Sequence, residues 1–196
     1  MSVEGRSKNP LRLEHICPWW LAYTFDNPLR RLIHRPEKIV GPYLKDGMTA
    51  IDIGCGLGFF SIAMAKLVGD TGRVISADLQ QKMLKVLRKR AQKAGMLHRI
   101  RTHLCRHGAI GVTEKCDFAL TFYMVHEVPN TRTFIREISQ IVKPAGKYLL
   151  VEPWIHTGPS YFEMIMAFAR EAGFTLAARP PVLFSRTALF ENASFQ

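Results

Sequence analysis

The sequence lacks the features that would place it in a membrane, outside the cell or among disordered chains. No apolar run among its 196 residues approaches the roughly 18 residues of a membrane-spanning helix. The first ten residues are polar, without the apolar core and cleavage site of a secretory signal. With 47% hydrophobic and 22% charged residues, wholesale disorder is excluded. We therefore expect one globular domain with a short appendage, located in the cytoplasm.

Cysteine is scarce, and its spacing excludes a disulfide scaffold. The four cysteines form no CxxC pair, so free thiols in a reducing compartment are expected. They are Cys17, Cys55, Cys105 and Cys116. The triplet His103-x-Cys105-x-His107 contains metal-type ligands, and so does His15-x-Cys17. Because neither has zinc-finger spacing and an isolated cysteine commonly acts as a small buried hydrophobe, we predict no metal site.

Acidic residues are few compared with basic ones. Lys and Arg number 27 and Asp and Glu 16, which gives a net charge of +11. Such a field favours acidic partners: nucleic acid, anionic lipid, or a small anionic cofactor or substrate. Several lysines lie in one predicted helix, opposite its apolar stripe, where a solvated helix face is the simplest interpretation. They are Lys82, Lys85, Lys89 and Lys93.

From about Thr49 onward, short apolar runs alternate with longer amphipathic ones, and no internal repeat is present. This alternation is typical of βαβ units around a parallel sheet. The predicted strands are Thr49–Ile53, Arg73–Ala77, Arg99–Leu104, Asp117–Phe122, Lys147–Glu152, Phe174–Arg179 and Thr187–Glu191. The predicted helices are Phe59–Val68, Gln80–Ala94, Thr131–Val142 and Ser160–Ala172. Ser160 and Glu163 have capping-box spacing at the start of the last helix.

Residues 1–47 have a different character. They contain Trp19 and Trp20 and several prolines that interrupt any long helix. Short helices near Pro28–His34 and Pro36–Tyr43 fit the preference of proline for a first helical turn. Because the segment is too short for a core of its own, we interpret 1–47 as a helical arm or cap packed against the sheet domain, 48–196.

The sharpest motif is a glycine-rich turn between the first strand and the first long helix. Gly54, Gly56 and Gly58 alternate with other residues, so the backbone can turn tightly and approach a ligand closely. This G-x-G-x-G spacing differs from the G-x-G-x-x-G of dinucleotide sites. Asp78, after the second strand, can accept ribose hydroxyls, and Asp52 can reach an ammonium group. The pattern favours an adenosyl group with an amino-acid tail; a purely structural turn, with Asp78 as a helix cap, is the alternative.

Four segments resemble one family in the expected order. Residues 50–60 resemble motif I of the class I S-adenosylmethionine-dependent methyltransferases, and 75–79, Ile-Ser-Ala-Asp-Leu, resemble its second motif. Residues 117–128 are similar to its fourth-strand motif, and 142–152 to the "LKPGG…LL" segment, with Ala145 in place of a glycine. The resemblance covers about Thr49–Pro153. It implies a Rossmann-like α/β fold: a seven-stranded, mostly parallel sheet of order 3-2-1-4-5-7-6, strand 7 antiparallel, with helices on both faces.

The resemblance also implies a cofactor site for S-adenosylmethionine, which leaves as S-adenosylhomocysteine. Its predicted residues are Asp52, Gly54, Gly56, Gly58, Asp78, Leu79, Cys105, Arg106 and Phe122. The glycine loop would face the methionine moiety, Asp78 would hold the ribose and Leu79 would pack against the adenine. Cys105 and Arg106 stand where the family usually has an acid near the adenine amine, so recognition of that amine stays open. The resemblance makes 48–196 the cofactor-binding domain and places the cap over the active site.

Methyl transfer is an in-line displacement, so a neutral hydroxyl or carbon acid needs a base as well as alignment. The predicted catalytic residues are His126, Glu127 and Tyr123, just past the fourth strand. Glu152 is a further candidate base, and Tyr23, His15 and His156 are weaker ones. The alternative for His126 is a purely structural hydrogen bond in the turn.

The expected acceptor is a small organic molecule. The tetrapeptide after the fourth strand, Thr-Phe-Tyr-Met at 121–124, is not the [DNS]PP[YF] of enzymes that methylate base amines, and no Pro-Cys occurs. Nucleic acid is therefore poorly supported by motifs, although the positive charge favours it. Two alternatives stay open: a methyltransferase of RNA or protein docked through the basic surface, and a catalytically silent S-adenosylmethionine-binding module.

Overall fold

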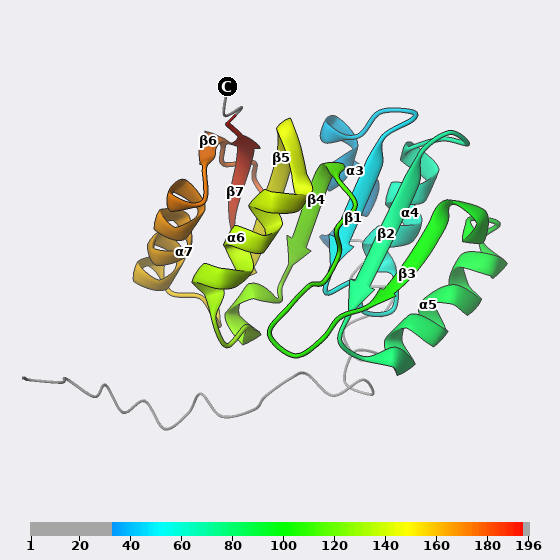
Figure 1. The fold of residues 1–196 in the computed structure, drawn as a ribbon, viewed down its shortest axis with the longest axis horizontal. Coiled ribbons are helices and arrows are strands. Elements are labelled where there is room, and N and C mark those ends of the chain that lie inside the picture. Colours follow the sequence, from blue (N-terminus) through cyan, green and yellow to red (C-terminus); the bar gives the residue numbers. More distant parts are fainter. Residues whose placement is uncertain (1–32, 194–196) are drawn as a thin grey trace, which may run out of the picture.

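A single twisted sheet forms the centre of the molecule. The computed structural model describes residues 33–193. The seven strands are β1 (Thr49–Ile53), β2 (Arg73–Asp78), β3 (Ile100–Leu104), β4 (Cys116–Phe122), β5 (Val142–Pro153), β6 (Phe174–Ala178) and β7 (Ser185–Asn192). Their order is β3-β2-β1-β4-β5-β7-β6, with β7 antiparallel to both neighbours (Figure 1). The predicted strand number, order and direction are confirmed.

Helices cover both faces of the sheet. The elements besides the strands are α3 (Pro36–Val40), η1 (Gly41–Tyr43), α4 (Phe59–Leu67), α5 (Gln81–Lys93), η2 (Leu97–Arg99), η3 (Val125–Glu127), α6 (Thr131–Ile141) and α7 (Pro159–Glu171). One core cluster joins α6 and α7 to the sheet, and a second joins α3, α4 and α5 to its other face. Figure 1 shows α6 and α7 in front of the sheet and α3 and α4 behind it.

The central strand β1 shows why the sheet is covered on both sides. Ile51 and Ile53 belong to the cluster under α6 and α7, whereas Ala50 belongs to the opposite cluster. Successive side chains point to opposite faces of a strand, so a strand buried on both faces is apolar throughout. Asp52 interrupts this run, although it too is buried, and this polar group needs a partner.

No helix separates β3 from β4; a loop, 105–115, crosses the sheet instead. Its residues Ile110 and Val112 are buried in the cluster under α6 and α7. Glu137 of α6 accepts hydrogen bonds from the N–H groups of Ile110 and Gly111, and the His103 Nε2 lies 2.8 Å from the Ile110 carbonyl oxygen. These hydrogen bonds hold the loop against the sheet, where a helix would otherwise connect two parallel strands.

The start of the last long helix differs from the prediction. The helix α7 begins at Pro159 with Gly158 as its N-cap, so Ser160 and Glu163 do not form a capping box. Proline fits the first helical position because its missing N–H would have no intrahelical partner there. Glu163 instead forms an ion pair with Arg179. The predicted capping box is therefore wrong, although the helix itself is confirmed.

The described end of the predicted cap belongs to the core of the sheet domain. Helices α3 and η1 occupy the predicted segment Pro36–Tyr43, and Val40 and Leu44 are buried in the cluster around α4 and α5. The predicted helix Pro28–His34 lies almost entirely outside the described residues, as do Trp19, Trp20, Tyr23, His15 and Cys17. Within residues 33–193, no helix has the length and hydropathy needed to cross a membrane.

Candidate functional site

The glycine loop after β1 lies at the carboxyl edge of the parallel strands, and its three glycines have positive φ values of 73°, 52° and 87°. A Cβ added to Gly54 would come within 2.8 Å of Met124, and one added to Gly58 within 2.7 Å of Leu87. Among residues 33–193, a Cβ on Gly56 would meet nothing within 4 Å. Close packing thus accounts for two of the glycines, whereas no described residue packs against the middle one.

Asp78, the last residue of β2, ties this loop to the start of α5. Its Oδ2 accepts a hydrogen bond from the Gly56 N–H at 2.9 Å, and its Oδ1 accepts one from the Gln80 N–H at 2.8 Å. The side chain is 8% exposed. Burial raises the pKa of Asp78, and these backbone hydrogen bonds partly oppose that rise. Each carboxylate oxygen keeps capacity for a further donor, such as a ribose hydroxyl.

Asp52 has a partner inside the protein. The Ser61 hydroxyl of α4 donates a 2.6 Å hydrogen bond to its Oδ2, and both side chains are buried. Asp52 therefore anchors the start of α4 to β1, directly before the glycine loop. A carboxylate has lone pairs for several donors.

The cysteines near this edge are neutral thiols. Burial raises the pKa of Cys105 to about 12, with added contributions from the charges of Asp78 and Glu137. Burial, with the charges of Asp52 and Asp78, also raises the pKa of Cys55 well above its ordinary value. A nucleophilic or metal-binding cysteine must be a thiolate. In the part of the chain that the structure describes, no three His, Cys, Asp or Glu side chains form a group that could hold a metal ion.

The remaining predicted cofactor residues stand on the rim of this edge. Leu79 follows β2 and is 41% exposed. The Cys105 N–H donates to the Asp78 carbonyl oxygen at 2.9 Å, so the end of β3 is held beside Asp78. Arg106 is exposed and forms a bridge with Ala109 in a tight turn.

The end of β4 brings aromatic and polar side chains together. Phe122 is buried, and its ring lies 4.3 Å from that of Tyr123 and 5.3 Å from that of His34 (centroid distances). The Tyr123 hydroxyl lies 2.6 Å from the Ser185 hydroxyl and 3.3 Å from the His34 Nε2. Tyr123 has a φ of 60°, a conformation that a bulky side chain adopts only when its surroundings impose it.

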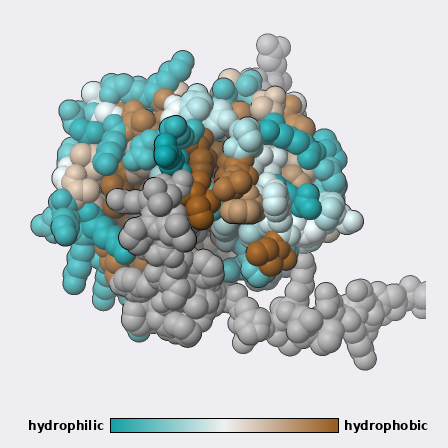
Figure 2. Space-filling view, turned by 180° about the vertical axis from the view of Figure 1, so that it is seen from behind, coloured by the Kyte–Doolittle hydropathy of each residue, from teal (hydrophilic) through white to brown (hydrophobic). Residues whose placement is uncertain are grey.

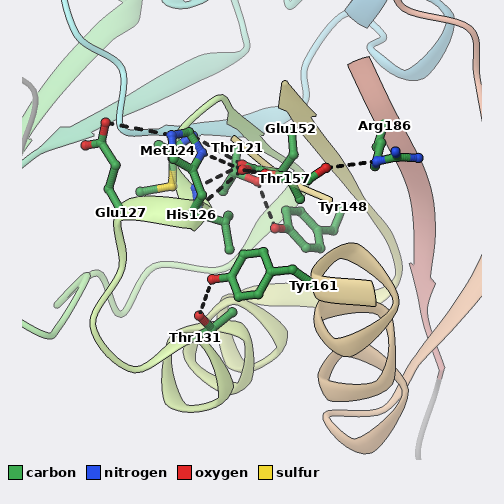
Figure 3. A network of polar contacts seen from close by, with 11 residues as sticks. Thr121, Met124, His126, Glu127, Thr131, Tyr148, Glu152, Thr157, Tyr161 and Arg186 are labelled. Atoms are coloured by element: carbon green, nitrogen blue, oxygen red, sulfur yellow. Dashed lines mark hydrogen bonds and ion pairs between the residues drawn. The ribbon is translucent and has the colours of Figure 1, made fainter. Parts of the chain in front are cut away.

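Glu152, near the end of β5, is the hub of a polar network that reaches past the end of β4 (Figure 3). It is fully buried, and its carboxylate accepts five hydrogen bonds. The donors are the N–H groups of Met124, Val125 and His126 at 3.2, 2.9 and 3.3 Å, the His126 Nδ1 at 2.6 Å and the Thr157 hydroxyl at 3.1 Å. A buried carboxylate with so many donors positions the groups around it. Its contacts suit Glu152 to a positioning role, and its candidacy as a base stays an untested prediction.

The Glu152 contact fixes the orientation of the His126 ring. Because Nδ1 faces the carboxylate, Nδ1 carries a proton and Nε2 is the titrating nitrogen. Burial lowers the pKa of His126, but the hydrogen bond and charge of Glu152, together with the charge of Glu127, outweigh it and raise the pKa overall. The Nε2 lies 3.9 Å from the Glu127 Oε1, and the ring stacks on His156 at 5.3 Å between centroids.

The two halves of the site meet at Met124. Its side chain lies against Gly54 of the cofactor loop, and its N–H donates to Glu152. The structure thus brings the predicted cofactor residues and the predicted base to one edge of the sheet. Sequence reasoning missed Ser185 and His34 as partners of Tyr123, because each lies far along the chain from it. It also missed Thr157, which is only five residues from Glu152, because no local pattern marks this contact.

Comparisons with known proteins agree with this architecture. A family model described as "Methyltransferase domain" matches residues 44–173. A demethylmenaquinone methyltransferase of Lactobacillus johnsonii is 30% identical over 138 residues, covering 66% of this chain and 57% of its own length. A ubiquinone/menaquinone biosynthesis C-methyltransferase of an Enterobacter species is 26% identical, covering 56% of this chain and 44% of its own length. The chain spans about half the length of the curated relatives that it matches.

Solved structures give the same fold. A methyltransferase described as SAM-dependent, from Aquifex aeolicus, superposes with a TM-score of 0.78 at 22% identity, covering 89% of this chain and 98% of its own. An O-methyltransferase described as SAM-dependent, from Thermotoga maritima, has a TM-score of 0.66 at 19% identity, covering 83% of this chain and 66% of its own. At these identities the likeness concerns the fold.

Proposed function

Because this chain belongs to the methyltransferase domain family of the class I S-adenosylmethionine-dependent methyltransferases, we propose that it binds S-adenosylmethionine and transfers the methyl group to a small organic molecule. The observation that carries the proposal is the pairing of Asp78 with the open position at Gly56. A carboxylate at the end of β2, beside a backbone position that no described side chain fills, is suited to the hydroxyls of a ribose.

The residues present fit this cofactor. Asp78 would accept the ribose hydroxyls through the lone pairs that its two backbone donors leave. The exposed Leu79 would cover one side of the adenine, and Cys105 and Arg106 would border it from the end of β3. The turn at Gly54, Gly56 and Gly58 would border the methionine moiety, with Asp52 as the nearby negative charge for its ammonium group and Phe122 near the sulfonium.

S-adenosylmethionine supplies, when bound, a methyl group on a positively charged sulfur. The protein has to hold the acceptor in line, exclude water and take a proton from an acceptor that is neutral. The His126 Nε2 is the proposed base. Glu152 binds the other ring nitrogen and fixes the ring, which leaves Nε2 to take a proton from the methyl acceptor. Glu127 faces the same nitrogen and would stabilise the imidazolium that results. The Tyr123 hydroxyl, held by Ser185, would orient the acceptor.

The proposed acceptor is a molecule with an acidic hydroxyl or an activated ring carbon. Two relatives carry the names of quinone-biosynthesis methyltransferases, so a reduced demethylmenaquinone is the first acceptor to test. Phe122 and Tyr123, stacked at the end of β4, offer aromatic surface for such a ring.

Calorimetric titration with S-adenosylmethionine and S-adenosylhomocysteine, at low and high salt, tests the cofactor first. We expect micromolar binding that changes little with salt. Methyl transfer to reduced demethylmenaquinone, catechols and thiols, followed by mass spectrometry, then tests the acceptor. A folded protein that binds neither cofactor form contradicts the proposal, and binding without transfer to any acceptor class favours the catalytically silent module.

A second candidate function, methylation of RNA, is favoured by one observation, the net charge of +11. It requires that the affinity of the protein for RNA fall steeply as salt rises, because each phosphate contact releases counterions. The predicted cap, residues 1–47, would then contribute to the binding of the RNA. Transfer to RNA fragments, assayed beside the small molecules, distinguishes the two candidates.

A further inference from the structure

Four large apolar side chains stand exposed on two neighbouring loops, one after β5 and one before β7. Trp154 is 52% exposed, Ile155 90%, Leu183 54% and Phe184 53%. We call these four residues the apolar rim. The loops are joined directly, because the Trp154 N–H donates to the Phe184 carbonyl oxygen at 3.1 Å and the two rings lie 5.9 Å apart, edge to face. Single exposed apolar residues are ordinary, whereas a group of them marks an interaction surface.

The rim is held in place by the backbone. Phe184 has a φ of 59°, which is unfavourable for a residue with a bulky side chain. The turn around it is closed by a hydrogen bond from the Ser185 N–H to the Val182 carbonyl oxygen at 3.1 Å, and His34 Nε2 lies 3.2 Å from the Leu183 carbonyl oxygen. The protein therefore fixes apolar side chains on its surface in a defined arrangement.

Positive charge adjoins the rim. A hollow of about 260 Å³ is lined by Leu183 and Val182 on one side and by Arg35 and Lys38 on the other. The same two cations also line a groove of about 870 Å³ between α3, α4 and α5, together with Lys66, Arg90 and Lys93. Glu37 is the acidic residue among the described residues that line it. We call these five cations the basic groove.

The neighbourhood of the basic groove is amphipathic. Its cations surround apolar side chains of α4, including Phe59 and Ile62. Figure 2 views the molecule from behind Figure 1 and shows brown, hydrophobic surface in the middle of this face with teal, hydrophilic side chains around it. Among residues 33–193, Arg35, Lys38, Lys66 and Lys93 form no ion pair, so these charges are available to an external anion.

We propose that the apolar rim and the basic groove together form a docking surface for a lipid bilayer with anionic headgroups. Exposed Trp, Phe, Leu and Ile side chains partition into the boundary between headgroups and acyl chains, and lysine and arginine beside them are attracted to anionic lipids. Nucleic acid fits this surface less well, because the aliphatic Ile155 and Leu183 neither stack on bases nor bond to phosphates.

The docking surface adjoins the candidate site without forming part of it. Ser185, which contacts the Tyr123 hydroxyl, follows Phe184 directly in the chain. A bilayer at the rim would thus lie next to the end of β4. The inference goes beyond the proposed function and does not depend on it, since bilayer binding requires neither cofactor nor acceptor.

The test is co-sedimentation of the full chain with vesicles of phosphatidylcholine alone and of phosphatidylcholine mixed with phosphatidylglycerol. We expect binding to the anionic vesicles that weakens as salt rises. Ile155 would be buried in the bilayer when the protein is bound. The variant Ile155→Glu removes that apolar contact and is expected to weaken partitioning into the vesicles by at least about tenfold. The double variant Arg35→Gln, Lys38→Gln is expected to weaken it by roughly 30-fold, since each cation near an anionic surface contributes about fivefold.

Matched controls separate this surface from general effects of charge and hydropathy. Leu176→Glu changes a leucine that is 43% exposed on the edge strand β6, and Lys45→Gln with Arg136→Gln removes two exposed cations elsewhere. Both controls should bind vesicles nearly as well as the unmodified chain. Circular dichroism confirms that every variant is folded.

Three results would overturn the proposal. One is a failure to bind anionic vesicles at low salt, and another is equal loss in the control and test variants. The third is RNA binding that is tighter than vesicle binding and unaffected by Ile155→Glu, which would make the surface a nucleic-acid interface. Calorimetry with S-adenosylmethionine on the same samples shows independently whether the proposed function fails.

Discussion

Replacing Glu152 by glutamine tests the assignment of this residue as the hub of the site. Glutamine has nearly the same shape but carries one acceptor oxygen and one NH2 group instead of two acceptor oxygens. The Glu152 Oε1 accepts from the Met124 and Val125 N–H groups, and the Oε2 from His126 and Thr157. Whichever way the amide turns, at least one buried backbone N–H loses its acceptor.

The magnitude follows from these contacts. An unsatisfied buried donor costs about 1–3 kcal/mol, and a hydrogen bond to a charged group contributes more than one to a neutral group. We therefore expect Glu152→Gln to lower the free energy of unfolding by about 2–4 kcal/mol. That is a large share of the roughly 5–15 kcal/mol by which a domain is stable. Guanidinium titration, followed by circular dichroism, measures the difference.

The same substitution should lower the pKa of His126. Burial lowers this pKa, and Glu152 with Glu127 raises it above the ordinary value, so removal of the Glu152 charge leaves burial dominant. A histidine with a raised pKa in the folded chain contributes stability below its unfolded pKa, about 6.5, and loses it as pH rises through the folded value. The stability difference between the unmodified chain and the variant should therefore be larger at acidic pH and shrink as pH rises through that window.

Titration of the histidine ring protons by NMR measures the pKa change. Glu137→Gln is the matched control, because Glu137 also accepts two backbone N–H groups but lies on α6 and contacts the loop 105–115. It should leave the His126 titration unchanged. An unaltered unfolding midpoint and an unaltered His126 pKa in Glu152→Gln would refute the assignment.

Four further substitutions separate structural from functional roles in the site. Gly58→Ala should destabilise the fold by about 2–4 kcal/mol, measured by guanidinium titration, because a left-handed backbone and a 2.7 Å approach to Leu87 both oppose a Cβ. Gly56→Ala, where a Cβ meets nothing within 4 Å, should cost only about 1–2 kcal/mol for its backbone conformation and should weaken S-adenosylmethionine binding in calorimetry. Asp78→Asn should weaken that binding by about 1–3 kcal/mol, because an amide cannot accept the two backbone N–H groups and a ribose hydroxyl as the carboxylate can. His126→Asn should slow methyl transfer to a neutral acceptor by roughly 10²–10⁴-fold while calorimetry shows the same cofactor affinity; equal losses in both measurements would contradict a role as base.

Much of the fold could be predicted because its signals are local. The apolar strand Thr49–Ile53, the three glycines after it and the amphipathic helix that follows are all set by neighbouring residues, and β1 has the predicted bounds. The predicted bounds of α4 exceed the observed ones by one residue at Val68. The failure at Ser160 is also local, since Gly158 and Pro159 already provide a helix start that makes a capping box unnecessary.

The site could be predicted only where its residues lie at the ends of neighbouring parallel strands that the sequence already marks. Asp78 ends β2 and Gly56 lies just after β1, and these two strands pair in parallel, so their contact follows from the expected sheet. The Glu152 network depends on the register of β5 against β4 and on the turn to Thr157, which no residue pattern specifies. The left-handed conformation of Tyr123 has no sequence signal either, because only glycine and asparagine commonly mark it.

The position of β7 has a consequence for the order in which the chain completes its sheet. The strand β6 precedes β7 in sequence, but its backbone pairs only with β7, which lies between it and β5. During synthesis, therefore, β6 has no strand to join and β5 keeps an open edge until Ser185–Asn192 have been made. An open edge can pair with other chains, so the interval before the last strand arrives is when the nascent protein is most exposed to aggregation.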